Sequence, residues 1–185
     1  DPMALAFPTN NEPVIIDISA SITTNNMIAD KISKNEFFDF NCLLTSEGVP
    51  TNDPKEVFEK NGTVMPVGGL EYGHKGFGLA LGIEALSQGL SGSGRRKKPK
   101  SMNLSTFVQV IDPDAFAGLK AFKDEMSFLY QECISNPPID INNKVRMPGQ
   151  QALLKRIKSI NEGINLSQET LSALKDISKK FNIIL

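Results

Sequence analysis

A glycine-rich stretch, GHKGFG at 73–78, holds the residues whose types and spacing most clearly suggest chemistry. Gly73, Gly76 and Gly78 let the backbone approach a ligand closely, and free N–H groups at the start of a helix attract anions such as pyrophosphate. Lys75 adds a point charge suited to a phosphate. We predict either a phosphate-contacting loop before a helix that begins at Phe77, or a tight loop whose glycines serve packing alone.

The stretch fits neither of the common phosphate-binding motifs. The residues before it, GGLEY at 68–72, are typical of a loop, whereas a G-x-G-x-x-G fingerprint needs a hydrophobic strand there and an acidic residue about 20 residues further on. A G-x-x-x-x-G-K-[ST] motif is also absent from the sequence. These patterns exclude a standard Rossmann or P-loop site.

Two further side chains are candidates for ligand contacts. His74 is the single histidine, so it cannot build a metal cluster by itself, and no carboxylate is spaced to orient it as a general acid. A hydrogen-bonding loop residue is the favoured interpretation of His74, with a cofactor contact left open. Asp17 follows a run of apolar residues and could bind ribose hydroxyls or cap the turn at 19–23, and the residues alone favour the cap.

The basic run RRKKPK at 95–100 has the composition of a nucleic-acid patch or a nuclear signal. No aromatic residue interleaves it, and the whole chain carries a net charge of −1. We therefore expect a solvated loop and no nucleic-acid partner, with a contact to the 2′-phosphate of NADP as an alternative.

The composition is that of a globular protein. Of 185 residues, 40% are hydrophobic and 22% are charged, which predicts a packed core. Cys42 and Cys133 are too few for a disulfide framework, so we expect reduced thiols and a cytoplasmic location. No apolar run approaches the ~20 residues of a membrane span, so no membrane partner is expected.

Hydrophobic periodicity predicts strands and helices that must position these candidates. The strands are expected at 13–18, 37–44 and 104–111, and the helices at 24–34, 77–90, 113–134, 151–160 and 168–181. They do not alternate strictly as β-α-β units, which favours an α+β fold with a mixed sheet layered with helices. The chain starts at Asp1 and meets a strand almost at once, which suggests a piece of a longer protein.

Six segments, taken in order, resemble the malate/L-lactate dehydrogenase family that lacks a standard Rossmann domain and includes sulfolactate, ureidoglycolate and diketogulonate oxidoreductases. The most specific is GGLEYGHKGFGLAL, which has the family form of GG, a few residues and G-[YHW]-K-G-[YF]-G-L-A-L. The six stretches are DPMALAFP (1–8), PVIIDIS (13–19), GVPTNDP (48–54), the segment 65–92, FVQVIDPDAF (107–116) and VRMPGQ (145–150).

This resemblance implies a homodimer that transfers a hydride between NAD (with NADP as an alternative) and a 2-oxo or 2-hydroxy acid, in a non-Rossmann α+β fold. It also implies that 1–120 are part of the cofactor-binding domain, and that 121–185 form a helical part that packs with an N-terminal helical region. By position, the cofactor contacts are expected at Pro13, Val14, Ile15, Ile16, Asp17, Ile18, Ser19, His74, Lys75, Gly149, Gln150 and Gln151. Gln150 stands where the family usually has glutamate.

The family's proton donor is a histidine in an R-x-x-H-G type segment, close to an arginine that binds the substrate carboxylate. No such segment occurs in this sequence, and His74 does not match it. No catalytic residue is therefore assigned to this chain, and we expect the catalytic half upstream or on another polypeptide. The alternative is a non-catalytic fragment or degenerate homologue that acts as a binding or dimerisation module.

Overall fold

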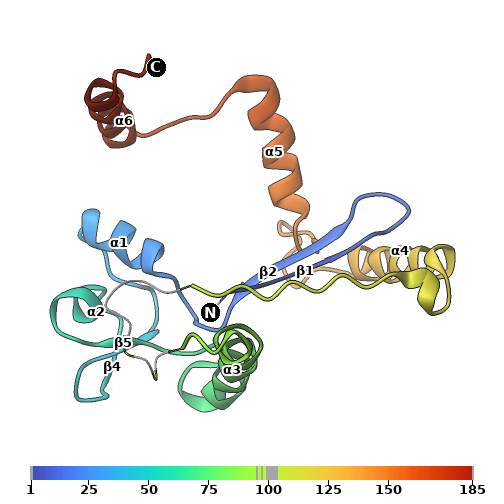
Figure 1. Cartoon of the computed structure of the whole chain (residues 1–185), viewed down its shortest axis with the longest axis horizontal. Helices are drawn as coiled ribbons and strands as arrows, with labels where there is room; N and C mark the ends of the chain where they lie inside the picture. Colours follow the sequence, from blue (N-terminus) through green and yellow to red (C-terminus); the bar gives the residue numbers. More distant parts are fainter. Residues whose placement is uncertain (1, 95, 97, 99–103, 185) are drawn as a thin grey trace.

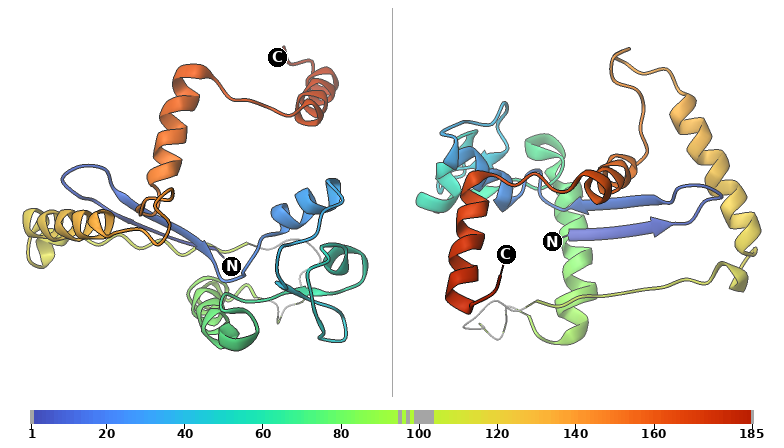
Figure 2. Two further views of the ribbon diagram at one scale, coloured as in Figure 1. Left: turned by 180° about the vertical axis from the view of Figure 1, so that it is seen from behind. Right: turned by 90° about the horizontal axis from the view of Figure 1, so that it is seen from above.

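The computed structural model describes residues 2–94, 96, 98 and 104–184, and its arrangement of helices with small sheets confirms the predicted α+β class. A β-hairpin extends across the middle, with a small sheet and the helices of residues 25–84 toward one end and the helix of residues 119–135 toward the other (Figures 1 and 2). The strands are β1 Pro2–Phe7, β2 Val14–Ser19, β3 Leu43–Leu44, β4 Pro50–Thr51 and β5 Thr63–Val64. The α-helices are α1 Asn25–Ser33, α2 Lys55–Glu59, α3 Gly69–Glu84, α4 Leu119–Ser135, α5 Gln150–Glu162 and α6 Gln168–Phe181.

The hairpin confirms the strand predicted at 13–18. β1 and β2 pair antiparallel along their whole length, from Pro2 opposite Ser19 to Phe7 opposite Val14. Its tip is held against α4, because the Asn10 side chain donates a 2.9 Å hydrogen bond to Asp124. Hydrogen bonds from Lys120 and then from Asn10 lower the pKa of the Asp124 carboxyl.

The predicted single mixed sheet is not observed among the described residues. They form two small antiparallel sheets, β1–β2 and β4–β3–β5. Short connections join β1 to β2 and β3 to β4, as is usual for antiparallel pairs, whereas β5 pairs with β3 only after β4 and α2.

The strand predicted at 37–44 is wrong except at β3. Its aromatic residues have different environments, since Phe38 is 6% exposed while Phe37 and Phe40 are more than half exposed. The Phe38 backbone is held by Asn52, whose side-chain amide donates a 2.9 Å hydrogen bond to the Phe38 carbonyl. The apolar run reflects the burial of one ring in an irregular segment rather than a regular alternation.

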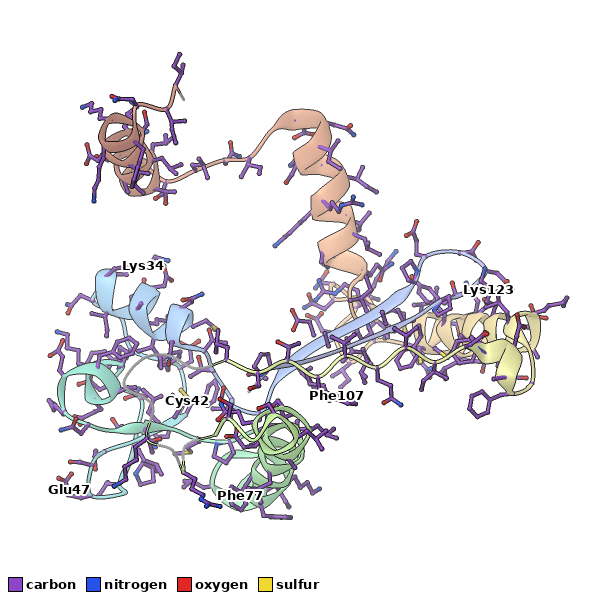
Figure 3. The ribbon with its side chains drawn as sticks, viewed as in Figure 1. Lys34, Cys42, Glu47, Phe77, Phe107 and Lys123 are labelled. Atoms are coloured by element: carbon purple, nitrogen blue, oxygen red, sulfur yellow. The ribbon has the colours of Figure 1, made fainter. Side chains whose placement is uncertain are left out.

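The main core lies between α1 and the three-stranded sheet, where Cys42 points inward (Figure 3). Thr24 is the N-cap of α1, because its hydroxyl accepts a hydrogen bond from the Met27 N–H at 3.2 Å. The core cluster comprises Ile28, Phe38, Cys42 and Leu43. Both cysteines are free, and burial raises the pKa of the Cys42 thiol.

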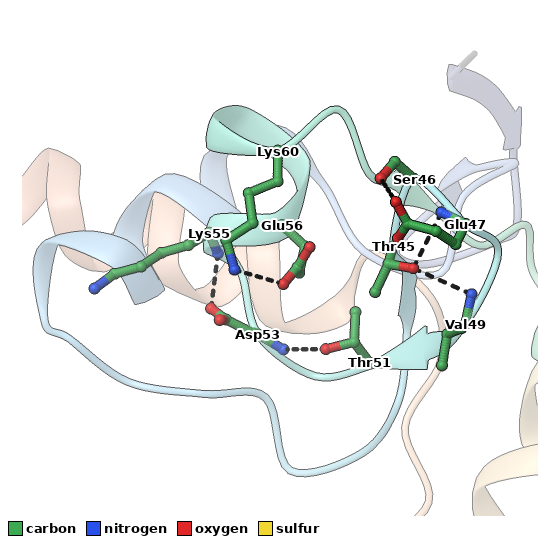
Figure 4. A network of polar contacts seen from close by, with 9 residues as sticks. All are labelled: Thr45, Ser46, Glu47, Val49, Thr51, Asp53, Lys55, Glu56 and Lys60. Atoms are coloured by element: carbon green, nitrogen blue, oxygen red, sulfur yellow. Dashed lines mark hydrogen bonds and ion pairs between the residues drawn. The ribbon is translucent and has the colours of Figure 1, made fainter.

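Side-chain hydrogen bonds shape the loops of this sheet (Figure 4). The Thr45 hydroxyl accepts hydrogen bonds from the N–H groups of Glu47 and Val49 and thereby closes the β3–β4 turn. Asp53 accepts a 3.0 Å hydrogen bond from the Lys55 N–H at the start of α2. These side chains thus fix the turn after β3 and the start of α2.

The glycine-rich stretch 73–78 is not a loop but the interior of α3, which begins at Gly69 rather than at Phe77. The reason is close packing, because a Cβ on Gly76 would lie 2.5 Å from both the N and the O of Val67. A Cβ on Gly73 would lie 3.1 Å from the Pro66 ring. Close packing therefore accounts for Gly73 and Gly76 but not for Gly78, which has no neighbour within 4 Å of an added Cβ. Neither predicted loop forms, because the N–H groups of 73–78 lie inside a helix.

The strand predicted at 104–111 is irregular, and among the described residues it pairs with no other strand. The helix predicted at 113–134 begins later, at Leu119, because Asp112 instead caps a 3₁₀ turn at Pro113–Ala115. The helices predicted at 24–34, 151–160 and 168–181 are confirmed as α1, α5 and α6. Residues 95, 97, 99 and 100 of the basic run lie outside the described residues.

None of the helices in the described part of the chain combines the length and hydrophobicity that a bilayer crossing needs.

Two glycines of α3 allow a test of this packing. Gly76→Ala should lower the free energy of unfolding by about 1–3 kcal/mol, because its Cβ would overlap the Val67 backbone. Gly78→Ala is the matched control, since no atom lies within 4 Å of its added Cβ. Alanine is the better helix former, so this control should gain up to about 1 kcal/mol. Urea unfolding measures both, and equal stability of the two variants would contradict the close approach.

Candidate functional site

The candidate site is organised by a junction between β2 and the loop that precedes α5. The Ile15 N–H donates a hydrogen bond to the Pro148 carbonyl at 3.2 Å. Gly149 presses against the same residue, because a Cβ on Gly149 would lie 2.8 Å from the Ile15 Cβ. The structure therefore brings together two of the three predicted groups, Pro13–Ser19 and Gly149–Gln151, which are far apart in the sequence.

The loop reaches this position through a turn that leads directly into α5. Gly149 has φ +85°, a conformation that favours glycine, and it is the N-cap of the helix. Gln150 closes the turn from both sides, since its N–H donates to the Met147 carbonyl and its side-chain oxygen accepts from the Met147 N–H. Gly149 thus fixes both the close approach to β2 and the direction of α5.

The start of α5 is suited to an anion. The Leu153 N–H donates to the Gly149 carbonyl, and the N–H groups of Gln151 and Ala152 have no partner among the described residues. Such free donors at the first turn of a helix carry a partial positive charge. Phosphate oxygens are typical ligands of this arrangement.

A small hollow of about 110 Å³ opens beside the junction. Ligand pockets usually enclose about 300–1,000 Å³, so this hollow is one wall of a site rather than a complete cleft. Two of its residues, Pro13 and Gln150, belong to the predicted group. The other residues that line the hollow were not among the predicted contacts, although Met147 and Pro148 belong to the VRMPGQ stretch: Glu12, Tyr130, Met147, Pro148, Leu153, Leu154 and Ile157.

Asp17 lies in the middle of β2, opposite Ala4, and its side chain is exposed. It makes no hydrogen bond or ion pair with the described residues. The cap of the 19–23 turn that the residues alone favoured is therefore wrong, since a strand residue at this register does not reach the turn. Hydroxyls hold the turn instead, with Ser19 donating to the Ser21 carbonyl and Ser21 to the Thr23 carbonyl, both at 2.8 Å.

His74 and Lys75 lie on α3, exposed, near the opposite end of β2 from the junction. Backbone hydrogen bonds tie the start of α3 to the residues after β2, including Val67 N–H to the Ala20 carbonyl at 2.8 Å. The Lys75 ammonium lies 5.3 Å from the centre of the Tyr72 ring. No hydrogen bond or ion pair joins Lys75 to β2 or to 148–151 within the described part of the chain.

The candidate residues are therefore distributed along β2 rather than gathered at one point. The α5 start adjoins its Val14–Ile15 end, Asp17 lies midway, and α3 follows its Ser19 end. A six-residue strand is roughly 20 Å long, so these groups suit an extended ligand with phosphate and hydroxyl groups at intervals.

Comparison with known proteins identifies a family for this chain. The profile of the family described as malate/L-lactate dehydrogenase matches residues 1–175. The malate dehydrogenase of Pyrococcus horikoshii is 29% identical over 99% of this chain and 53% of its own length. The malate/(S)-sulfolactate dehydrogenase of Methanothermus fervidus is also 29% identical, over 100% of this chain and 53% of its own.

The fold is similar to that of solved structures of such enzymes. A crystal structure of malate dehydrogenase from Entamoeba histolytica has a TM-score of 0.85 and 22% identity, over 100% of this chain and 55% of that chain. The chain thus spans about half the length of the curated relatives and structures that it matches.

A glycine pair tests the junction. Gly149→Ala should cost about 1–3 kcal/mol more in unfolding free energy than Gly48→Ala, because only the former Cβ would meet Ile15. Both glycines have positive φ, +85° and +80°, so the control isolates the cost of the contact from that of the backbone. Amide hydrogen exchange should also show faster exchange at Ile15 in Gly149→Ala alone. Unchanged exchange there would contradict the junction.

Proposed function

The chain belongs to the malate/L-lactate dehydrogenase family, and from this membership we propose that it is the cofactor-binding part of an oxidoreductase. The proposed reaction transfers a hydride between a nicotinamide dinucleotide and a 2-oxo or 2-hydroxy acid. The observation that carries the proposal is the junction of Ile15 with Pro148 and Gly149, which unites two segments that the family resemblance assigns to the cofactor. The acids named for the relatives, malate and sulfolactate, indicate the substrate class.

The groups along β2 fit a dinucleotide by their chemistry. The free N–H groups of Gln151 and Ala152 are donors for phosphate oxygens. The Asp17 carboxylate accepts hydrogen bonds from ribose hydroxyls and has no competing partner among the described residues. We assign Lys75 to the phosphates and His74 to a polar contact beside them, from the α3 side.

Asp17 also favours NAD over NADP. A carboxylate that accepts hydrogen bonds from a ribose repels a 2′-phosphate at the same place, and no described cation pairs with Asp17 to neutralise it. The nicotinamide supplies the hydride when the cofactor is bound. This chain's residues bind and orient it, while the proton donor and the substrate-binding arginine that the family implies come from outside this chain, within a homodimeric protein.

Turnover by the intact native protein tests the proposal. NADH oxidation with a panel of 2-oxo acids, including oxaloacetate, pyruvate and sulfopyruvate, should show activity with at least one of them. Calorimetric binding of NADH without turnover of any acid would support the alternative, a degenerate homologue that only binds. Absence of both binding and turnover would contradict the cofactor assignment itself.

Lys75→Ala should weaken NADH binding roughly tenfold, about 1.4 kcal/mol, through loss of one ammonium–phosphate contact. Lys180→Ala is the matched control, because Lys180 also places its ammonium over a neighbouring aromatic ring, at 5.6 Å from Phe181. Calorimetry on the intact protein compares the two variants. Unchanged affinity in Lys75→Ala would remove Lys75 from the site.

Asp17→Asn should change cofactor preference. NADH affinity should fall roughly tenfold as a charged hydrogen bond is lost, while NADPH affinity should hold or rise because the repulsion disappears. Asp39→Asn removes the same charge from another exposed position and should alter neither value. A parallel loss of affinity for both cofactors would contradict the assigned role in discrimination.

A further inference from the structure

The chain exposes far more surface than a folded protein of its size. Its accessible surface is 14,502 Å². A folded monomer of 20.2 kDa exposes roughly 8,800 Å² by the usual scaling. The surplus is several times the ~800 Å² that one partner contributes to a standard interface. Its size corresponds to missing parts of a fold rather than to a single docking patch.

Part of this surplus lies along the free edge of β1. β1 pairs with β2 on one edge, and no described residue pairs with its other edge. The strand, PMALAF, carries no charge and has no bulge in its register with β2. Natural proteins protect exposed edges with charges, bulges or a covering element, so this edge is built to be covered. Its continuous apolar sequence is also typical of a strand buried on both faces.

A second unpaired segment runs along the same side of the hairpin. Residues 104–111, LSTFVQVI, follow the direction of β1 in both views, on the side away from β2 (Figures 1 and 2). They are rich in β-branched residues, yet Val108 is 78% exposed and Val110 is 90% exposed. No backbone hydrogen bond joins this segment to the rest of the described chain. The segment therefore has the composition of a β-strand but no hydrogen-bonded partner strand among the described residues.

We propose that one strand from outside this chain inserts beside the hairpin and pairs with both β1 and 104–111. The resulting sheet has the order β2, β1, the inserted strand and 104–111. The occupant is an apolar strand from the half of the family fold that this chain does not contain, since the matching structures are about twice as long. A second copy of this chain is the less suitable occupant, because the surplus exceeds what a standard dimer contact covers. The proposal does not depend on the proposed catalytic reaction.

Amide hydrogen exchange of the intact native protein tests the proposal. Alternate amides of 105–111 should exchange at least about 100-fold more slowly than the same amides in a synthetic peptide of this sequence. Exchange at the peptide rate would overturn the proposal. So would protection of these amides that disappears when the intact protein is diluted to a monomer, because a second copy would then be the occupant.

A substitution pair gives a second measurement. Val110→Lys should lower the melting temperature of the intact protein by several degrees, because the inserted strand would bury the added charge. Gln131→Lys adds the same charge at an exposed position of α4 and should leave that melting temperature nearly unchanged. Equal effects of the two variants on the intact protein would also overturn the proposal. Neither measurement requires cofactor binding or turnover, so failure here is distinct from failure of the proposed function.

Discussion

The contact of Gly149 and Pro148 with Ile15 is the constraint on which the candidate site depends. One hydrogen bond and one approach that only glycine permits attach the start of α5 to the central hairpin. The same contact sets the first turn of α5, with its free N–H groups, beside the strand that carries Asp17. A side chain at position 149 would separate the two segments and also change the direction of α5. Local backbone conformation and site geometry are therefore coupled at a single residue.

The sequence predicted well what local chemistry determines. The β-branched run at 13–18 placed β2, and helical periodicity placed α6, where the Ser167 hydroxyl accepts a hydrogen bond from the Thr170 N–H. Prediction failed where contacts between distant residues decide the conformation. Gly73 and Gly76 suggested a loop because glycine weakens a helix, but they are needed where α3 packs on Pro66 and Val67. No sequence pattern marked Tyr130 or Leu153 as neighbours of β2, since both belong to ordinary apolar helix stripes.

The same distinction explains an apparent conflict in α4, α5 and α6. Their apolar periodicity predicted the helices, but the described residues leave many of these apolar positions exposed. Their apolar positions recur at helical spacing, yet Leu129, Ile157 and Phe181 are each at least half exposed. An amphipathic pattern records where a helix is covered in the complete protein, not whether the cover belongs to the same chain. Helical propensity and capping depend on nearby residues, so the helices form in this chain. Covering their apolar faces requires further residues that pack against them. Periodicity thus predicted the elements correctly and also carries information about surfaces beyond this chain.

This incompleteness bears directly on cofactor binding. The groups assigned to the cofactor lie on β2, α3 and α5, and α5 is held to β2 by the single junction at Ile15. Any opening of this junction would raise the apparent dissociation constant of the cofactor, in inverse proportion to the fraction of molecules that keep the binding geometry. Elements that cover the helices and the β1 edge would raise this fraction without touching the cofactor. Completion of the fold and cofactor affinity are therefore linked, because the same rigid hairpin must support both.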